Sequence, residues 1–107
     1  MNYNITATPK FKKELKKLAK KYHSLKKEYA DFIESLEQEP TQGDSLGNNC
    51  YKVRLAIASK GKGKSGGARV ITTLFVANKT VYLLSIYDKS EKESISNKEL
   101  SELLKFI

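Results

Sequence analysis

The spacing of the hydrophobic residues changes near the middle of this chain, and the change restricts the fold more than any other feature. In the first half, apolar residues recur every three or four positions, which is the period of amphipathic helices. From residue 51 onward they stand at every second position: Tyr51, Val53, Leu55 and Ile57. This is the period of a strand with one buried face. Helices therefore precede a sheet instead of alternating with its strands, which favours an α+β fold.

Two apolar stripes with helical spacing predict a helical hairpin in the first half. The first stripe consists of Phe11, Leu15, Leu18, Ala19 and Tyr22. The second consists of Leu25, Tyr29, Phe32, Ile33 and Leu36. Thr8 and Pro9 supply a cap and a first-turn proline for the first helix, and a break at His23 and Ser24 separates the two helices. Residues 41–49 are predicted to form an exposed loop after the hairpin.

A three-stranded antiparallel meander is predicted for the second half. The first strand begins at Tyr51. The second and third cover approximately residues 68–77 and 80–87. Asn78 and Lys79 join the last two strands in a tight hairpin, because Asn tolerates the left-handed conformation that such a turn requires.

Further elements are predicted at both ends of the chain. The alternating residues Tyr3, Ile5 and Ala7 predict an N-terminal edge strand. Ser96 and Glu99 match a capping box and precede the apolar stripe of a final helix: Leu100, Leu103, Leu104 and Ile107. The expected α+β fold is one domain over residues 1–107. An N-terminal strand and a helical hairpin precede the meander, and a C-terminal helix closes the chain.

The positive charge of the chain indicates a polyanionic partner, with nucleic acid first and an acidic protein second. The formal net charge is +8 over 107 residues, which is high for a single domain. It has two sources: nine lysines with two acids between Lys10 and Glu28, and seven bases with no acid between Cys50 and Lys79. We interpret the first source as the solvated face of a helix, with stems that cover apolar surface. A phosphate-binding face is the alternative.

Several other classes of protein are not indicated. No apolar run approaches the ~20 residues of a membrane-spanning helix, and the N-terminus lacks the apolar run of a signal peptide, so we expect a cytoplasmic protein. Cys50 and His23 are the single residues of their kinds, too few for an internal disulfide or a structural zinc site. No metal or cofactor is therefore expected. We interpret His23 as an exposed turn residue and Cys50 as a small apolar residue.

A basic, glycine-rich segment at residues 59–67 leads into the second strand of the meander. It is similar to a Walker A phosphate-binding loop only superficially, since the required first glycine is replaced by Ala58 and a strand follows where a helix is needed. We expect a basic hairpin loop that binds the RNA backbone through Lys60, Lys62 and Lys64. A loop that merely aids solubility is the alternative.

Four side chains on the predicted meander form a candidate site. Lys52 and Arg54 lie two residues apart on a strand and point away from its apolar face. Tyr87, on the third strand, is expected to face the same way, whereas Arg69 shares its row with Ile71 and its direction stays open. Fixed cations stabilise the phosphorane that forms when an RNA 2′-hydroxyl attacks the adjacent phosphate. Tyr87 is the candidate general base, because nearby cations would lower its pKa.

Three segments together are similar, in order and spacing, to the RelE/ParE superfamily of type II toxins, and most closely to its HigB-like branch. They are YKVRL at 51–55, GGARVI at 66–71 and VYLLSIYDK at 81–89. The resemblance covers nearly the whole chain and implies a RelE-like fold. It also implies a ribosome-dependent mRNA endonuclease (mRNA interferase) that needs no metal, cleaves codons in the A site and inhibits translation.

The resemblance assigns phosphate binding and transition-state stabilisation to four cations: Lys52, Arg54, Arg69 and Lys89. Some relatives place a catalytic tyrosine six residues after the last of these, but this chain has Ile95 there. We therefore expect Tyr87 to act in its place.

The expected partners are the ribosome with its mRNA and a cognate antitoxin. An acidic antitoxin segment would cover the basic sheet face, and in related systems the antitoxin often carries a helix-turn-helix domain, so that operon DNA is contacted only through it. Two alternative functions stay open. One is a ParE-like inhibitor of DNA gyrase, and the other is a basic nucleic-acid-binding module without catalysis.

Overall fold

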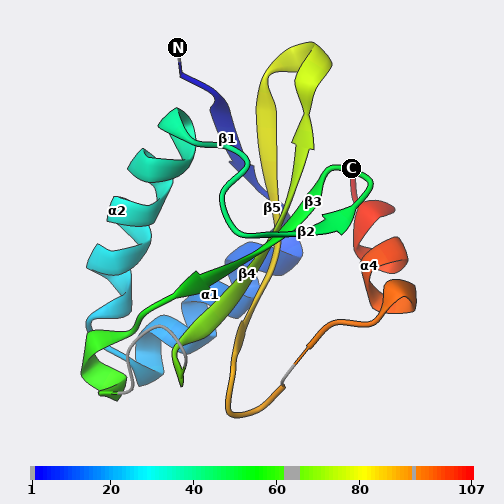
Figure 1. Ribbon diagram of the computed structural model, residues 1–107. Coiled ribbons are helices and arrows are strands. Elements are labelled where there is room, and N and C mark those ends of the chain that lie inside the picture. Colours follow the sequence, from blue (N-terminus) through cyan, green and yellow to red (C-terminus); the bar gives the residue numbers. More distant parts are fainter. Residues whose placement is uncertain (1, 62–65, 93) are drawn as a thin grey trace.

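The computed structural model describes residues 2–61, 66–92 and 94–107. Five strands lie in this part of the chain: β1 (Asn4–Ala7), β2 (Asp44–Gly47), β3 (Cys50–Leu55), β4 (Ala68–Phe75) and β5 (Thr80–Asp88). The helices are α1 (Pro9–Lys21), α2 (Leu25–Gln38) and α4 (Asn97–Leu104), with short 3-10 turns η1 (Ala58–Lys60) and η2 (Val76–Asn78). The predicted helical hairpin, edge strand and C-terminal helix are confirmed (Figure 1).

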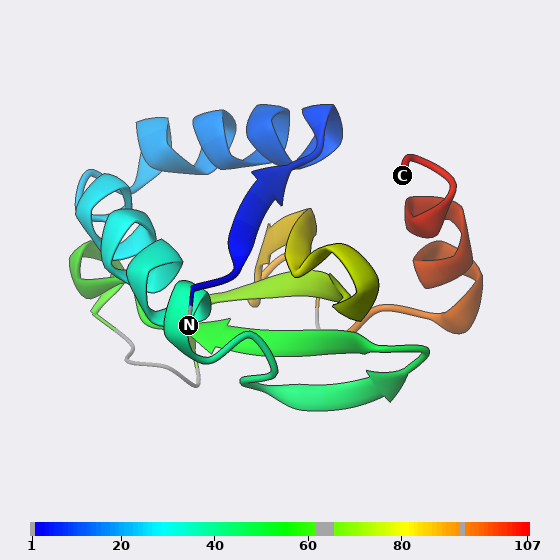
Figure 2. The same ribbon diagram turned by 90° about the horizontal axis from the view of Figure 1, so that it is seen from above.

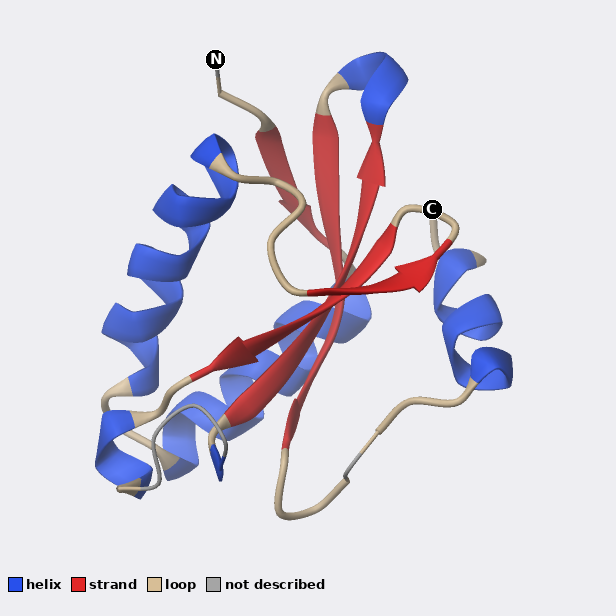
Figure 3. Cartoon of the chain, viewed as in Figure 1, coloured by secondary structure: helices blue, strands red, loops and turns tan. Residues whose placement is uncertain are grey.

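The strands form one mixed sheet in the order β1-β5-β4-β3-β2. Strands β2 to β5 pair antiparallel, as the meander predicts, whereas β1 pairs parallel with β5. Figures 2 and 3 show α2 and α4 on either side of this sheet. The expected α+β class is therefore confirmed. The sheet has five described strands, one more than the predicted three-stranded meander and N-terminal edge strand together, and the additional strand is β2.

The sheet divides the apolar core in two. Helices α1 and α2 pack on one face in the larger cluster, which includes Phe11, Leu18, Phe32, Val53, Val70 and Ile86. Helix α4 packs on the other face in a smaller cluster, which consists of Cys50, Ile71, Leu84, Tyr87, Leu100 and Leu103. We call the second face the α4 face. The sequence analysis expected one apolar face with Lys52 and Arg54 on the other, but the other face is apolar too at the end that α4 covers.

Two turns differ from their predictions. Residues 41–49 are not only a loop, because β2 pairs with β3 through a two-residue turn at Asn48 and Asn49. Both residues have positive φ angles, 52° and 59°, which matches the type I′ turns that join hairpin strands. In the β4–β5 hairpin the left-handed residue is Lys79 (φ 50°) and not Asn78, since η2 occupies the preceding three residues.

The predicted helix caps are confirmed. The backbone N–H of Phe11 donates to Oγ1 of Thr8 at 3.3 Å, and Ser96 and Glu99 exchange both hydrogen bonds of a capping box. Among the described residues, no helix combines the length and the hydropathy that crossing a bilayer requires.

Candidate functional site

Strand register places Arg54, Arg69 and Tyr87 in one row across the sheet. Arg54 pairs with Arg69 on β4, and Arg69 pairs with Tyr87 on β5. Side chains directly opposite each other on neighbouring strands point to the same face. Lys52 precedes Arg54 by two residues and therefore also lies on the α4 face. The structure thus brings these four predicted residues together and settles the direction of Arg69.

A β-bulge interrupts the alternation of side chains along β5. Ile71 pairs with Ser85, but Thr72 pairs with Leu83, so Leu84 is an extra residue on β5. Such an insertion reverses the alternation of side chains beyond it. Leu84 and Tyr87 consequently both pack in the smaller cluster, although they stand three positions apart.

The two arginines of the row differ in environment. Arg54 is exposed, whereas Arg69 is only 3% exposed and donates from Nη1 to the carbonyl oxygen of Ala68 at 3.1 Å. Burial lowers the pKa of Arg69, and the charge of Arg54 lowers it further, while Tyr87 and Asp44 oppose these effects. The row therefore concentrates positive charge, and an anion bound to it would relieve the repulsion.

Strand β2 brings to the site a carboxylate, Asp44, that was not among the residues predicted from the sequence. Asp44 pairs with Lys52 across the β2–β3 ladder. Both residues line a cavity of about 370 Å³, together with Gln42, Gly43, Val53 and Arg54. The usable sequence signal was the turn at Asn48 and Asn49, since a hairpin there folds Asp44 back onto the strand that carries Lys52.

Tyr87 does not have the expected ionisation. Burial raises its pKa, Arg69 opposes this with a smaller lowering effect, and Glu99 raises the pKa further. The expectation that neighbouring cations lower the pKa of Tyr87 is therefore wrong, because burial dominates. The hydroxyl is buried with no hydrogen-bond partner among the described residues, and the Lys92 ammonium lies 5.5 Å from the ring centroid. Tyr87 is consequently a neutral phenol within an apolar cluster, which is unsuited to accepting a proton.

Lys89 leaves β5 beside the start of β4. Its backbone N–H donates to the carbonyl oxygen of Gly67 at 3.0 Å. A side chain at Gly67 would not fit, because its Cβ would lie 2.2 Å from the carbonyl oxygen of Leu55. Lys89 is half-buried, and its backbone bond to Gly67 keeps it beside the start of β4. Ile95 packs against the smaller cluster.

The predicted RNA-binding loop is only partly described. Lys60 forms an ion pair with Asp88, and its side chain is 8% exposed while that of Asp88 is fully buried. The prediction of a free, RNA-binding side chain is therefore wrong for Lys60, since its ammonium is committed to a buried carboxylate. Lys62 and Lys64 lie outside the described residues.

Asp88 joins three segments of the chain on the face that carries α1. Besides the Lys60 ammonium, its carboxylate accepts hydrogen bonds from Oη of Tyr22 at 2.6 Å and from the backbone N–H of Ser90 at 2.9 Å. Burial would raise the pKa of Asp88, but the bonds from Lys60, Tyr22 and Ser90 outweigh it and hold the pKa well below its ordinary value. This network fixes the end of β5 between Tyr87 and Lys89.

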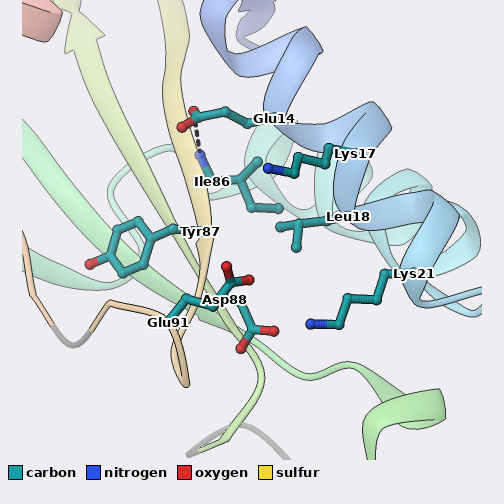
Figure 4. A pocket seen from close by; sticks show the side chains of 8 residues that line it. All are labelled: Glu14, Lys17, Leu18, Lys21, Ile86, Tyr87, Asp88 and Glu91. Atoms are coloured by element: carbon teal, nitrogen blue, oxygen red, sulfur yellow. Dashed lines mark hydrogen bonds between the residues drawn. The ribbon is translucent and has the colours of Figure 1, made fainter.

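A cavity of about 270 Å³ lies between α1 and the end of β5, on the side away from the arginines. Figure 4 shows Asp88 and Glu91 facing Lys21 there, while the Tyr87 ring points away. Tyr87 lines this cavity, but Lys52, Arg54 and Arg69 do not, so it is not the candidate site. The described residues form no cluster of three or more His, Cys, Asp or Glu side chains that could hold a metal ion. At Arg54 and Arg69 the described side chains offer electrostatic stabilisation by fixed cations, with the Asp44 carboxylate nearby.

A family model identifies the family, and solved structures share the fold. A family model described as the RelE toxin of the RelE/RelB toxin–antitoxin system matches residues 8–106. A double arginine-to-alanine mutant of E. coli toxin RelE in the free state aligns with a TM-score of 0.67 at 19% identity, covering 100% of this chain and 99% of that chain. The toxin–antitoxin complex RelBE2 from Mycobacterium tuberculosis gives a TM-score of 0.59 at 17% identity, covering 82% and 99%. The same E. coli mutant bound to an antitoxin RelB peptide gives 0.53 at 23%, covering 100% and 99%.

Proposed function

This chain belongs to the RelE toxin family of type II toxin–antitoxin systems, and from this premise we propose that it cleaves mRNA in the ribosomal A site. The observation that carries the proposal is the row of Arg54, Arg69 and Tyr87 on the face that also carries Lys52. The fold holds two guanidinium groups side by side, although like charges directly opposite on neighbouring strands are destabilising. A phosphate is the substrate group that makes such a pair favourable.

The cations would act on the transition state. The 2′-oxygen of the nucleotide forms a bond to the adjacent phosphorus, and the bond from phosphorus to the 5′ oxygen breaks. The phosphorane between these events carries an extra negative charge, which preorganised donors such as Arg54, Arg69 and Lys52 stabilise. The products are a 2′,3′-cyclic phosphate and a 5′-hydroxyl, and the leaving oxygen takes its proton from water.

The proton of the 2′-hydroxyl needs an acceptor, and we assign this role to Asp44 instead of Tyr87. The Asp44 carboxylate borders the cavity that Lys52 and Arg54 line, whereas burial keeps Tyr87 neutral. A carboxylate is a weak base for a hydroxyl, so the rate depends strongly on how the RNA is oriented. This supports dependence on the ribosome, which would hold the strand in line for attack.

The same charges support a cognate antitoxin as partner. The net charge of +8 favours an acidic segment that covers the arginine row and excludes the RNA. Two of the similar structures are complexes of RelE-family toxins with their antitoxins. Operon DNA would then be contacted only through the antitoxin, and assignment to the HigB-like branch stays a prediction.

Primer extension in a translating extract tests the proposed activity. Wild-type protein should produce cuts within codons at the A site, and Arg54→Ala together with Lys52→Ala should abolish them, since both side chains are accessible and their loss leaves the core intact. The control variant Lys98→Ala removes an exposed lysine from α4 and should cut normally. Normal cutting by the Lys52 and Arg54 variant would refute the site. Inhibition of gyrase supercoiling without any RNA cleavage would refute the function.

A further inference from the structure

The side-chain amide of Gln42 is held in one orientation. Its Nε2 group donates to Oγ of Ser35 at 3.1 Å and to the carbonyl oxygen of Glu39 at 3.2 Å. Both partners act as acceptors here, because a carbonyl oxygen never donates and the Ser35 hydroxyl donates its own hydrogen to the carbonyl oxygen of Phe32 at 2.7 Å. Both amide hydrogens are therefore occupied. The amide oxygen points away from these partners and accepts no hydrogen bond from the described residues.

The backbone that carries Gln42 is fixed against β3. Gln42 lies in the segment that leads from α2 to β2 (Figure 1) and is followed by Gly43. Gly43 has a φ angle of 100°, and a Cβ atom there would lie 2.5 Å from the carbonyl oxygen of Lys52. Only glycine allows this conformation together with so close an approach. Gln42 is therefore held beside the strand that carries Lys52 and Arg54.

Two neighbouring cavities share Gln42 and Arg54 in their walls. The first, of about 370 Å³, contains Asp44. The second, of about 320 Å³, lies toward α2 and contains Glu28 and Asp31 of that helix. Both volumes fall within the range of about 300–1,000 Å³ that is usual for small-ligand pockets. The two cavities can therefore hold adjoining parts of one nucleotide, with Gln42 between them.

The charges of the two cavities favour different parts of that nucleotide. The first cavity presents the cations Lys52 and Arg54, which attract a phosphate. The second presents the carboxylates Glu28 and Asp31, which repel a phosphate and attract N–H donors. A nucleotide whose phosphate binds at Arg54 would consequently direct its base toward α2, where the amide oxygen of Gln42 is available.

We propose that Gln42 determines base specificity by accepting a hydrogen bond from the exocyclic amino group of one nucleotide in the A-site codon. The inference rests on the proposed function, since it concerns the RNA whose phosphate lies at Arg54. Adenine, guanine and cytosine each carry an exocyclic amino group, whereas uracil has none. The fixed orientation is what makes the selection, because an amide that could rotate would offer its N–H hydrogens to a base carbonyl instead.

Capping of α2 is the structural role that Gln42 would have without RNA, since Glu39 is the C-cap residue of that helix. Loss of a cap lowers the stability of the fold and would affect the cleavage of every codon alike. Base recognition instead changes the ratio of cleavage rates between two RNAs that differ only in one amino group. This ratio therefore separates the two roles.

Single-turnover cleavage of mRNA on ribosomes paused at a defined codon measures this ratio. At each codon position, a nucleoside is compared with the analogue in which hydrogen replaces its amino group: inosine for guanosine, purine riboside for adenosine and zebularine for cytidine. The test variant is Gln42→Met, which keeps a long unbranched side chain without an amide. The matched control is Gln38→Met, because Gln38 is exposed at the end of α2 and its side chain forms no hydrogen bond with the described residues. Circular dichroism verifies that each variant is folded.

Wild type and Gln38→Met should cut the amino-bearing RNA about fivefold faster than its analogue in at least one codon position, which is the effect of about one hydrogen bond. Gln42→Met should lose this preference. Ser35→Ala removes one of the two acceptors that orient the amide, so it should reduce the preference, and it decides the result if Gln42→Met is inactive on every RNA.

Two results would overturn the inference while leaving the proposed function in place. One is cleavage by the wild type at equal rates for every pair of RNAs. The other is a preference that Gln42→Met leaves unchanged or, where that variant is inactive, that Ser35→Ala leaves unchanged. Absence of any cleavage by the wild type would instead refute the proposed function, and this inference with it.

Discussion

Arg54 and Arg69 lie directly opposite each other on β3 and β4, so the sheet holds two guanidinium groups on the same face. Arg69 is almost completely buried, and after burial itself the charge of Arg54 is the main influence that lowers its pKa. Like charges at this spacing repel each other, and an anion bound between them is attracted to both. Stability and activity should therefore respond in opposite directions when one member is removed.

Replacing Arg54 by glutamine should separate these two effects. Arg54→Gln should raise the free energy of unfolding by about 0.5 kcal/mol, because it removes a like-charged cross-strand pair. It should lower mRNA cleavage by about 100-fold, because a donor to the phosphorane is lost. Urea denaturation and primer extension measure the two quantities. A variant that loses stability and activity together would show that Arg54 supports the fold.

The proton acceptor can be identified by comparing two conservative variants. Asp44→Asn should reduce cleavage by at least about 100-fold, the contribution expected of a general base. Tyr87→Phe should stay within about threefold of wild type, because the hydroxyl that it removes is buried and neutral. It should not destabilise the protein, since an unpaired buried hydroxyl is lost. The reverse pattern, with Tyr87→Phe inactive and Asp44→Asn active, would restore the tyrosine as the catalytic group.

The buried pair of Asp88 and Lys60 should make stability depend on pH. Because folding holds the pKa of Asp88 below its ordinary value of 3.8, its ionised form contributes stability that is complete above that value. This contribution is lost as the pH falls toward the lowered pKa. Asp88→Asn should cost about 3–5 kcal/mol at neutral pH, since the Lys60 charge stays buried without its partner.

Urea denaturation of wild type and Asp88→Asn at pH 7 and at about pH 3 checks this expectation. The difference between the two proteins should shrink at the lower pH. A difference that does not change with pH would show that the carboxylate acts through its shape and not its charge. The double variant Lys60→Met with Asp88→Asn should recover part of the loss, because no uncompensated charge then remains buried.

Features encoded in neighbouring residues were predictable, whereas those that depend on distant pairing were not. Thr8 and the Ser96–Glu99 box mark helix starts through local hydrogen bonds. That Tyr87 shares a face with Leu84, three residues earlier, depends on a bulge that appears only when β5 pairs with β4. No local pattern reveals such a register shift.

The roles of two predicted site residues also depend on contacts between segments that are far apart in the sequence. Lys60 reads as a loop lysine until the fold places it against Asp88, which follows 28 residues later. The pKa of Tyr87 follows from its burial in the cluster that α4 completes. A cation on the neighbouring strand therefore does not set the pKa of a tyrosine when tertiary packing removes water from its hydroxyl.

Cleavage of a single mRNA, presented free and on ribosomes paused at a defined codon, tests the central claim most directly. Wild type should cut the A-site codon of the ribosome-bound mRNA and should cleave little of the free RNA. The variant that carries Arg54→Gln and Lys52→Ala should make no cuts. Equal cleavage of free and ribosome-bound RNA, or unchanged cuts by the variant that lacks both cations, would contradict the claim.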